Sequence, residues 1–167
     1  FVGQHCKKGY SIINDENKAG KKIGERVLKA RPNSILYIGV DETDTMVGIN
    51  RRDAVFKVLK KSSNLVIEEI KSDFSFEKTE ELIYEYLKIK KPECIISATD
   101  NMAFGAMKAI YRHGYKIPED ISILGFGGYK ISDVVTPRLT TIKYNNEITG
   151  KLAAETIIKL IRNEEVP

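Results

Sequence analysis

The fold class is decided by residues 91–129, KPECIISATDNMAFGAMKAIYRHGYKIPEDISILGFGGY. The apolar run Cys94–Ala98 predicts a short strand that is covered on both faces. Apolar residues then recur with the spacing of one helix face as far as Gly114, which predicts a helix that ends at a left-handed glycine. Ile121–Phe126 predicts a second buried strand. The stretch is therefore a β-α-β unit with parallel strands and a right-handed crossover.

The carboxyl ends of these two strands predict where a ligand binds. Ligands of parallel α/β sheets lie beyond the carboxyl ends of the strands, here Thr99-Asp100 and Phe126-Gly127-Gly128. We expect both segments to line one crevice. Two alternatives stay open: Asp100 is also a good N-cap for the helix, and Gly127-Gly128 also suits a turn.

The rest of the chain alternates strands and helices in the same way. Strands are expected at 34–40, 65–70 and 139–142, and helices from a cap at Asp15 or Asn17 to about 29, and over about 47–61, 76–90 and 146–162. We expect the last helix to bury Ile148, Leu152, Ala153, Thr156, Ile157, Leu160 and Ile161. This alternation is typical of an α/β protein with a mostly parallel sheet flanked by helices.

Length and composition describe one globular domain. The 167 residues are 42% hydrophobic and 30% charged, and no apolar run approaches the roughly 20 residues that span a bilayer. Phe1–Gln4 resembles the tail of a strand and includes no initiator Met, so we expect a fragment of a longer protein. Cys6 and Cys94 have no metal-ligand spacing; reduced thiols are expected, which favours the cytoplasm.

The charge pattern excludes specific nucleic-acid binding by this chain alone. The net charge of +4 comes from 27 Lys and Arg against 23 Asp and Glu, and the excess is scattered. No basic stripe is interleaved with aromatic residues, and no helix-turn-helix or zinc-finger pattern is present in the sequence.

Three side chains near the expected carboxyl edge are candidates for binding a small polar molecule. Arg51 and Arg52 are expected in or near the first turn of a helix, where cations oppose the helix dipole but can recruit a phosphate or carboxylate. The alternative is a solvated pair held by Asp44 or Asp53. Phe74 lies in a polar loop and could stack on the apolar face of a sugar, or alternatively plug the loop against the next helix.

The sequence does not predict an enzyme. His5 and His113 are far apart, no nucleophile is paired with a base, and neither nucleotide-binding glycine motif is present. We expect no metal site and no cofactor.

These residues resemble the effector-binding core of lactose/galactose-repressor-type transcription regulators. The segments SATDNMAFGAMKAI, IPEDISILGFGG and TPRLTTIKYNNEITGKLAAETIIKLI carry the resemblance, and SIINDENKAG, VGINRRDAVF and KSDFSFEKTEEL follow in family order. The run GVDETDTMVGINRR, with FVGQ upstream, is most similar to the sucrose and trehalose operon repressors of this family.

The resemblance implies a two-lobed, periplasmic-binding-protein-like (type I) core without its DNA-binding headpiece. Residues 6–126 and 142–167 would belong to the second lobe. Residues 1–5 and 127–141 would be pieces of the first lobe and of the crossovers between lobes.

The resemblance also implies the residues of a sugar site between the lobes. Arg52 matches the family's sugar-contacting arginine, and Phe74 matches the aromatic residue that stacks on the effector. The other implied positions depart from common family residues: Gln4 lies in a pair that replaces Asp-Arg, Thr99 beside Asp100 replaces Asn, Gly127 replaces Asp and Tyr144 replaces Gln.

Two further expectations concern the partners. A second stripe on the 101–113 helix, together with the resemblance, predicts a homodimer through Phe104, Met107, Lys108, Tyr111 and Val135. Arg51 and Arg52, with no carboxylate at Gly127, predict a preference for a phosphorylated sugar such as a disaccharide phosphate.

The expected function is therefore a sugar-responsive transcriptional regulator, a repressor, that reaches operator DNA only through its headpiece and has no membrane contact. The alternative is an exported sugar-binding protein of a transport system.

Overall fold

The computed structural model describes residues 1–166 and divides the chain into two compact units. The sheet unit is Glu16–Lys143, and the terminal unit joins Phe1–Asp15 to the chain from Tyr144 onward. These units have other boundaries than the expected lobes, because residues 127–143 group with the sheet and residues 144–161 group with the N-terminus. The assignment of segments to the lobes of a longer protein stays a prediction.

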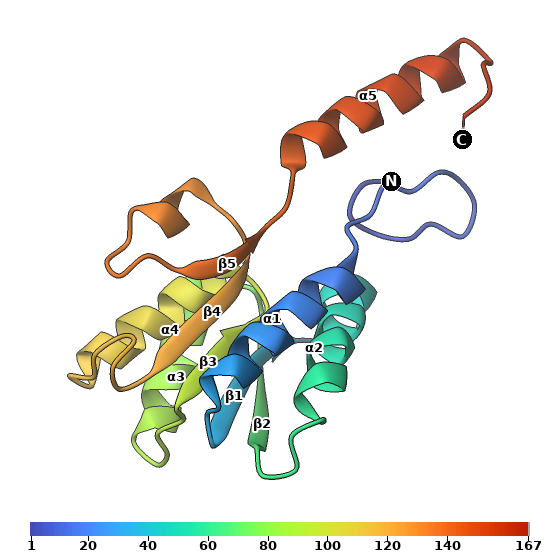
Figure 1. The fold of residues 1–167 in the computed structure, drawn as a ribbon. Coiled ribbons are helices and arrows are strands. Elements are labelled where there is room, and N and C mark those ends of the chain that lie inside the picture. The colour runs from blue at the N-terminus through green and yellow to red at the C-terminus, as the bar shows by residue number, and fades with distance from the viewer. Residues whose placement is uncertain (167) are drawn as a thin grey trace. The chain divides into compact units, whose positions relative to one another are not determined.

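The sheet unit is built on one fully parallel sheet, as predicted. Its strands are β1 (Ser34–Val40), β2 (Val66–Ser72), β3 (Cys94–Ser97), β4 (Ser122–Gly127) and β5 (Thr140–Lys143). The strand order is β2-β1-β3-β4-β5, and every neighbouring pair is parallel. All carboxyl ends therefore lie at one edge, which we call the carboxyl edge (Figure 1).

Helices cover both faces of this sheet. The helical segments are α1 (Glu16–Ala30), a π-helix (Thr45–Arg51), α2 (Arg52–Leu59), α3 (Phe76–Leu87), α4 (Asp100–Arg112), a 3₁₀-helix (Lys130–Asp133) and α5 (Asn146–Ile161). The pair α1 and α2 packs on one face, and the pair α3 and α4 packs on the other (Figure 1). Gly114, with φ +77°, follows α4 in the left-handed conformation that the sequence predicted.

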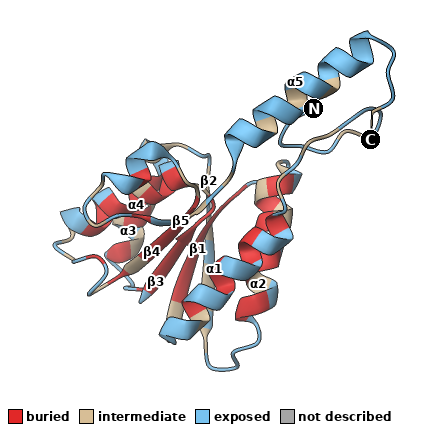
Figure 2. Cartoon of the chain, turned by 45° about the horizontal axis from the view of Figure 1, so that its top comes forward, coloured by how far each residue is buried: buried red, intermediate tan, exposed pale blue. Residues whose placement is uncertain are grey.

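The core lies along the two central strands. Every residue of Ile35–Val40 and of Cys94–Ser97 is buried, whereas the edge strands β2 and β5 are exposed or half-buried along much of their length (Figure 2). Continuous apolar runs are typical of strands covered on both faces, and both predicted runs have that environment.

The expected burial along α5 is wrong. None of its residues is buried, and Ile148, Leu152, Ile157 and Leu160 are each more than 40% exposed. Within the terminal unit the helix borders an apolar hollow of about 260 Å³ formed with residues of the first twelve. A helical period identifies an apolar stripe but not the surface that covers it, and no sheet strand lies among residues 1–15 and 144–166.

Candidate functional site

The loops after β1, β2, β3 and β4 converge at the carboxyl edge of the sheet unit. Lys71 Nζ and Glu42 Oε1 lie 3.4 Å apart, and Asn101 Nδ2 donates to the Phe74 carbonyl oxygen at 2.8 Å. The Asp100 carboxylate accepts from Gly128 N at 2.8 Å. These contacts bring the loops of the sheet unit together at one edge, and the crevice itself stays a prediction.

Arg51 does not point to a ligand, contrary to the prediction. Its guanidinium donates twice to the Glu16 carboxylate, each at 2.7 Å, and once to the Ala98 carbonyl oxygen at 2.7 Å. Both side chains are buried, and the guanidinium carbon lies 5.0 Å from the centre of the Phe126 ring. Sequence analysis missed this partner because Glu16 is 35 positions away, and no local pattern connects the two.

The helix expected over about 47–61 starts earlier than predicted, so the charges of Arg51 and Arg52 lie further from its N-terminus. The helical segment begins at Thr45, where Asp44 accepts from Met46 N and Val47 N at 3.1 and 2.9 Å. Arg51 and Arg52 therefore lie in the second turn, beyond the partial positive charge of the N-terminus. The first turns have π-helical hydrogen bonding, a rare geometry that is frequently found at functional sites.

Arg52 faces the carboxyl edge as expected, but acidic residues already compensate its charge. Nη1 donates to Glu42 at 2.6 Å and Nε donates to Asp53 at 2.9 Å. The hydrogen bond to Glu42 raises the pKa of Arg52 and holds the pKa of Glu42 below its usual value. An effector must share Arg52 with these carboxylates. Of the two arginines expected to attract a phosphorylated effector, only Arg52 therefore stays a candidate.

Phe74 is 38% exposed and has a backbone φ of +68°, which is unusual for an aromatic residue. Asp73 accepts from Ser75 N and Ser75 Oγ, and Ser75 caps α3 by accepting from Lys78 N. The hydrogen bond from Ser75 lowers the pKa of Asp73. The ring is accessible, and its loop is fixed by hydrogen bonds on both sides.

Asp100 does not cap α4; Thr99 does, accepting from Met102 N at 3.3 Å. The Asp100 side chain is fully buried and instead accepts from Gly128 N, Tyr129 N, the Ser132 hydroxyl and the Thr141 hydroxyl at 2.6–3.2 Å. These bonds tie the start of α4 to the segment between β4 and β5. Asp100 is therefore a structural anchor, whereas the preceding predicted site residue, Thr99, is half-exposed at the edge.

The geometry at Gly127 explains why this position lacks a carboxylate. Its φ is +145°, and an added Cβ would lie 3.3 Å from Asp100 Cγ and 3.1 Å from the Tyr129 ring. A side chain there would be strained, and an Asp would place a second negative charge against Asp100.

The remaining predicted site residues, Gln4 and Tyr144, belong to the terminal unit. Gln4 is exposed after the short bridge between Val2 and Ile12, and Tyr144 is half-buried just after β5. Their participation in the site stays a prediction.

The predicted dimer residues form a groove on α4. This α4 groove has a volume of about 540 Å³ and is lined by Phe76, Asn101, Phe104, Met107, Lys108, Tyr111, Tyr129, Ile131, Val135 and Thr136. Tyr111 donates to the Thr136 carbonyl oxygen at 2.8 Å, and Lys108 pairs with Glu80 at 2.8 Å. All five predicted residues thus share one largely apolar surface.

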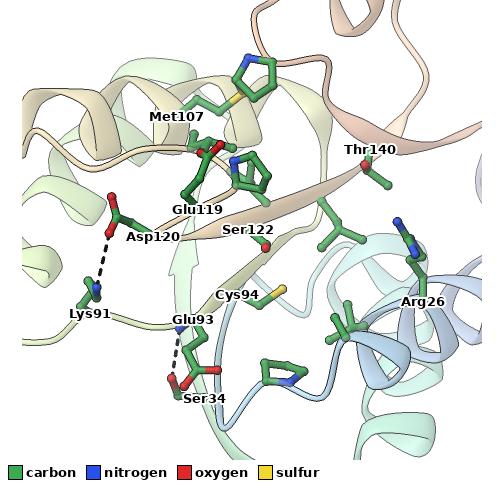
Figure 3. A pocket seen from close by; sticks show the side chains of 18 of the residues that line it. Arg26, Ser34, Lys91, Glu93, Cys94, Met107, Glu119, Asp120, Ser122 and Thr140 are labelled. Atoms are coloured by element: carbon green, nitrogen blue, oxygen red, sulfur yellow. Dashed lines mark hydrogen bonds and ion pairs between the residues drawn. The ribbon is translucent and has the colours of Figure 1, made fainter.

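A hollow larger than the α4 groove, of about 750 Å³, lies elsewhere. It is bordered by the amino ends of several strands, at Ser34, Cys94, Ser122 and Thr140 (Figure 3). Its labelled charged groups include an ion pair between Lys91 and Asp120 at 3.8 Å. This end of the sheet is opposite the carboxyl edge, so the hollow is not the predicted crevice.

Residues 1–166 contain neither a metal-binding cluster nor a membrane-spanning helix. No group of three or more His, Cys, Asp or Glu side chains there is arranged to hold a metal ion. No helix in that range is long and apolar enough to span a membrane.

Residues 25–167 match the family model for the periplasmic binding protein-like domain, and the chain belongs to that family. Within it, the chain is similar to proteins of the lactose/galactose-repressor type. It is 28% identical to the sucrose operon repressor of Staphylococcus xylosus over 99% of this chain and 52% of that protein. It is 31% identical to the lactose operon repressor of Rhizobium radiobacter over 45% of this chain and 66% of that protein.

The solved structures agree on the fold. A dimeric Lac repressor that lacks 11 C-terminal residues superposes with a TM-score of 0.86, at 24% identity, over 93% of this chain and 57% of that chain. The predicted fold, a periplasmic-binding-protein-like core with a parallel sheet flanked by helices, is confirmed. The chain spans about half the length of the sucrose operon repressor.

Proposed function

We propose that this chain is the sugar-sensing and dimerising part of a transcriptional repressor. The observation that carries the proposal is the composition of the carboxyl edge, where the accessible ring of Phe74 and the Arg52 guanidinium lie beside carboxylates. The chain also belongs to the periplasmic binding protein-like family. The relatives support a regulator over an exported transport protein, since both operon proteins named above are repressors. A repressor acts in the cytoplasm and contacts its operator through a DNA-binding headpiece.

The effector is a sugar that stacks on Phe74 and is hydrogen-bonded by Arg52, with Thr99 as a further contact. Charge-assisted hydrogen bonds to a sugar hydroxyl or phosphate are stronger than neutral ones, at about 1.5–3 kcal/mol each. Glu42 and Asp53 balance the charges of Arg52 and Lys71, so this cluster offers a phosphate no excess positive charge and accommodates a neutral sugar. Calorimetry with sucrose and with sucrose 6-phosphate separates the two classes.

A second copy of the chain covers the α4 groove. Tyr111 is 44% exposed in this groove and Val134 beside it is 73% exposed, which is a large apolar surface for a regulator to leave in water. Phe104→Glu would place a charge inside the interface and convert the dimer to a monomer. Sedimentation that finds the parent protein monomeric at tens of micromolar would argue against this surface.

Thermal-shift screening of the full-length protein against neutral and phosphorylated sugars tests the sensing role directly. A sugar present at 100 times its Kd stabilises the native state by about 2.7 kcal/mol and raises its melting temperature. Arg52→Ala and Phe74→Ala should each reduce the shift, whereas Lys57→Ala, an exposed change on the same helix, should leave it intact. No shift with any sugar would refute the proposal.

A further inference from the structure

Phe74 stands apart from the other described residues with a left-handed backbone. Among residues 1–166 the non-glycine positions with positive φ are Arg31, Phe74 and Asn163. Arg31 directly follows α1 and Asn163 lies just beyond α5, where a left-handed residue is ordinary. Phe74 instead lies between β2 and α3. It precedes a helix, so the left-handed position that commonly follows a helix does not explain its conformation.

A glycine would adopt this conformation without strain, yet the sequence places a large aromatic residue there. Strained backbone of this kind persists only where the surrounding structure holds it, and it concentrates at functional sites. The ring itself is 38% exposed, so core packing does not account for it. We therefore infer that the left-handed backbone at Phe74 serves to hold the ring in one position at the carboxyl edge.

One hydrogen bond reaches this residue from another element. Asn101 Nδ2, in the first turn of α4, donates to the Phe74 carbonyl oxygen at 2.8 Å. Within the loop, Asp73 Oδ1 accepts from Ser75 Oγ and from Ser75 N, the amide of the peptide group that contains the Phe74 carbonyl, and Ser75 Oγ accepts from Lys78 N. Asn101 adds the bond that comes from outside the loop. Asn101 is exposed, so its side chain is free of any core role.

The start of α4 is an unusually fixed point for such a donor. Thr99 caps the helix, and the buried Asp100 ties the same turn to the segment after β4. At Gly105, one turn further on, an added Cβ would overlap the Phe76 carbonyl oxygen, so α4 and the start of α3 are in direct backbone contact. A donor mounted here holds the 73–76 loop against a rigid helix.

We propose that Asn101 is a positioning residue for the effector site: its amide holds Phe74 in the left-handed conformation and so fixes the ring at the carboxyl edge. The inference rests on the proposed function only in that the ring contacts a sugar. Without the bond, Phe74 relaxes to an extended conformation and the ring loses its place.

A double-mutant cycle on the full-length protein tests this with sucrose as the probe. Asn101→Ala should weaken sucrose binding about three- to tenfold by calorimetry. In the Phe74→Ala background the same change should alter the affinity by less than twofold, because the ring on which Asn101 acts is gone. An unchanged affinity, or an equal loss in both backgrounds, would overturn the proposal.

Two controls accompany the cycle. Asn64→Ala removes an exposed asparagine from a loop remote in sequence and should leave the affinity at the parent value. Asn101 also lines the α4 groove, so its replacement could change the affinity through dimerisation. Sedimentation of each variant should therefore show the same oligomeric state as the parent protein.

A ligand-free measurement separates failure of this inference from failure of the sugar proposal. The chain contains no tryptophan, so Phe74→Trp introduces a reporter at the position in question. Asn101→Ala should lower the fluorescence anisotropy of Trp at this position, after subtraction of the parent protein's emission, and Asn64→Ala should not. If sucrose fails to bind, only the proposal of a sugar effector is refuted. If Asn101→Ala leaves the anisotropy unchanged, the positioning role of Asn101 is refuted.

Discussion

The adjacent residues Arg51 and Arg52 should behave as opposites when each is replaced by methionine. Arg51→Met leaves the Glu16 carboxylate, whose side chain is 4% exposed, without its two bonds of 2.7 Å, and also removes the donor to Ala98. Loss of one partner from a buried ion pair costs about 3–5 kcal/mol. Arg52 pairs with Glu42 and Asp53, which are 52% and 59% exposed, and exposed pairs contribute about 0–1 kcal/mol.

Urea unfolding of the full-length protein, followed by circular dichroism, measures both values. We expect the free energy of unfolding to fall by about 3–5 kcal/mol for Arg51→Met and by no more than about 1 kcal/mol for Arg52→Met. The double variant Glu16→Met with Arg51→Met should recover most of the loss, because burying two apolar side chains avoids the desolvated charge. Equal losses at the two arginines, or a double variant as unstable as the sum of its parts, would refute this reasoning.

Three other changes test the frame of the site. Asp100→Asn turns an amide toward donors that need an acceptor, and it should cost about 2–5 kcal/mol in urea unfolding; a loss below about 1 kcal/mol would contradict the anchor role. Gly105→Ala should cost about 1–3 kcal/mol by overpacking against the Phe76 carbonyl, and an unchanged unfolding midpoint would count against that contact. Burial raises the pKa of the Cys94 thiol to about 12, so iodoacetamide at pH 8–9 should modify Cys6 far faster than Cys94; mass spectrometry showing equal rates would argue against the buried thiol.

The sheet could be predicted from sequence because its signals are local. Each buried strand is one continuous apolar run, and the helical period before Gly114 fixes α4 to within a residue. Side chains that face the edge, such as Arg52 and Phe74, could be proposed because parallel strands bring their carboxyl ends together.

The errors arose where tertiary partners decided the outcome. Arg51 was misread because its partner Glu16 lies on another helix, and the cap was assigned to Asp100 because its four tertiary donors are invisible in the sequence. The strain at Phe74, and with it the role of Asn101, depends on backbone angles that no residue pattern reports. The expected burial of α5 required a covering surface that its own unit does not provide.

The most direct test of the account is the affinity of the full-length protein for its operator, with and without sugar. Fluorescence anisotropy of a labelled operator duplex should change by at least tenfold in Kd when the sugar that raises the melting temperature is added, since an effector acts only through differential affinity for two states. Arg52→Ala should bind the duplex normally and lose the response. A protein that binds sugar while its affinity for DNA stays the same, or that binds no duplex at all, would contradict the claim that this chain is the sensor of a repressor.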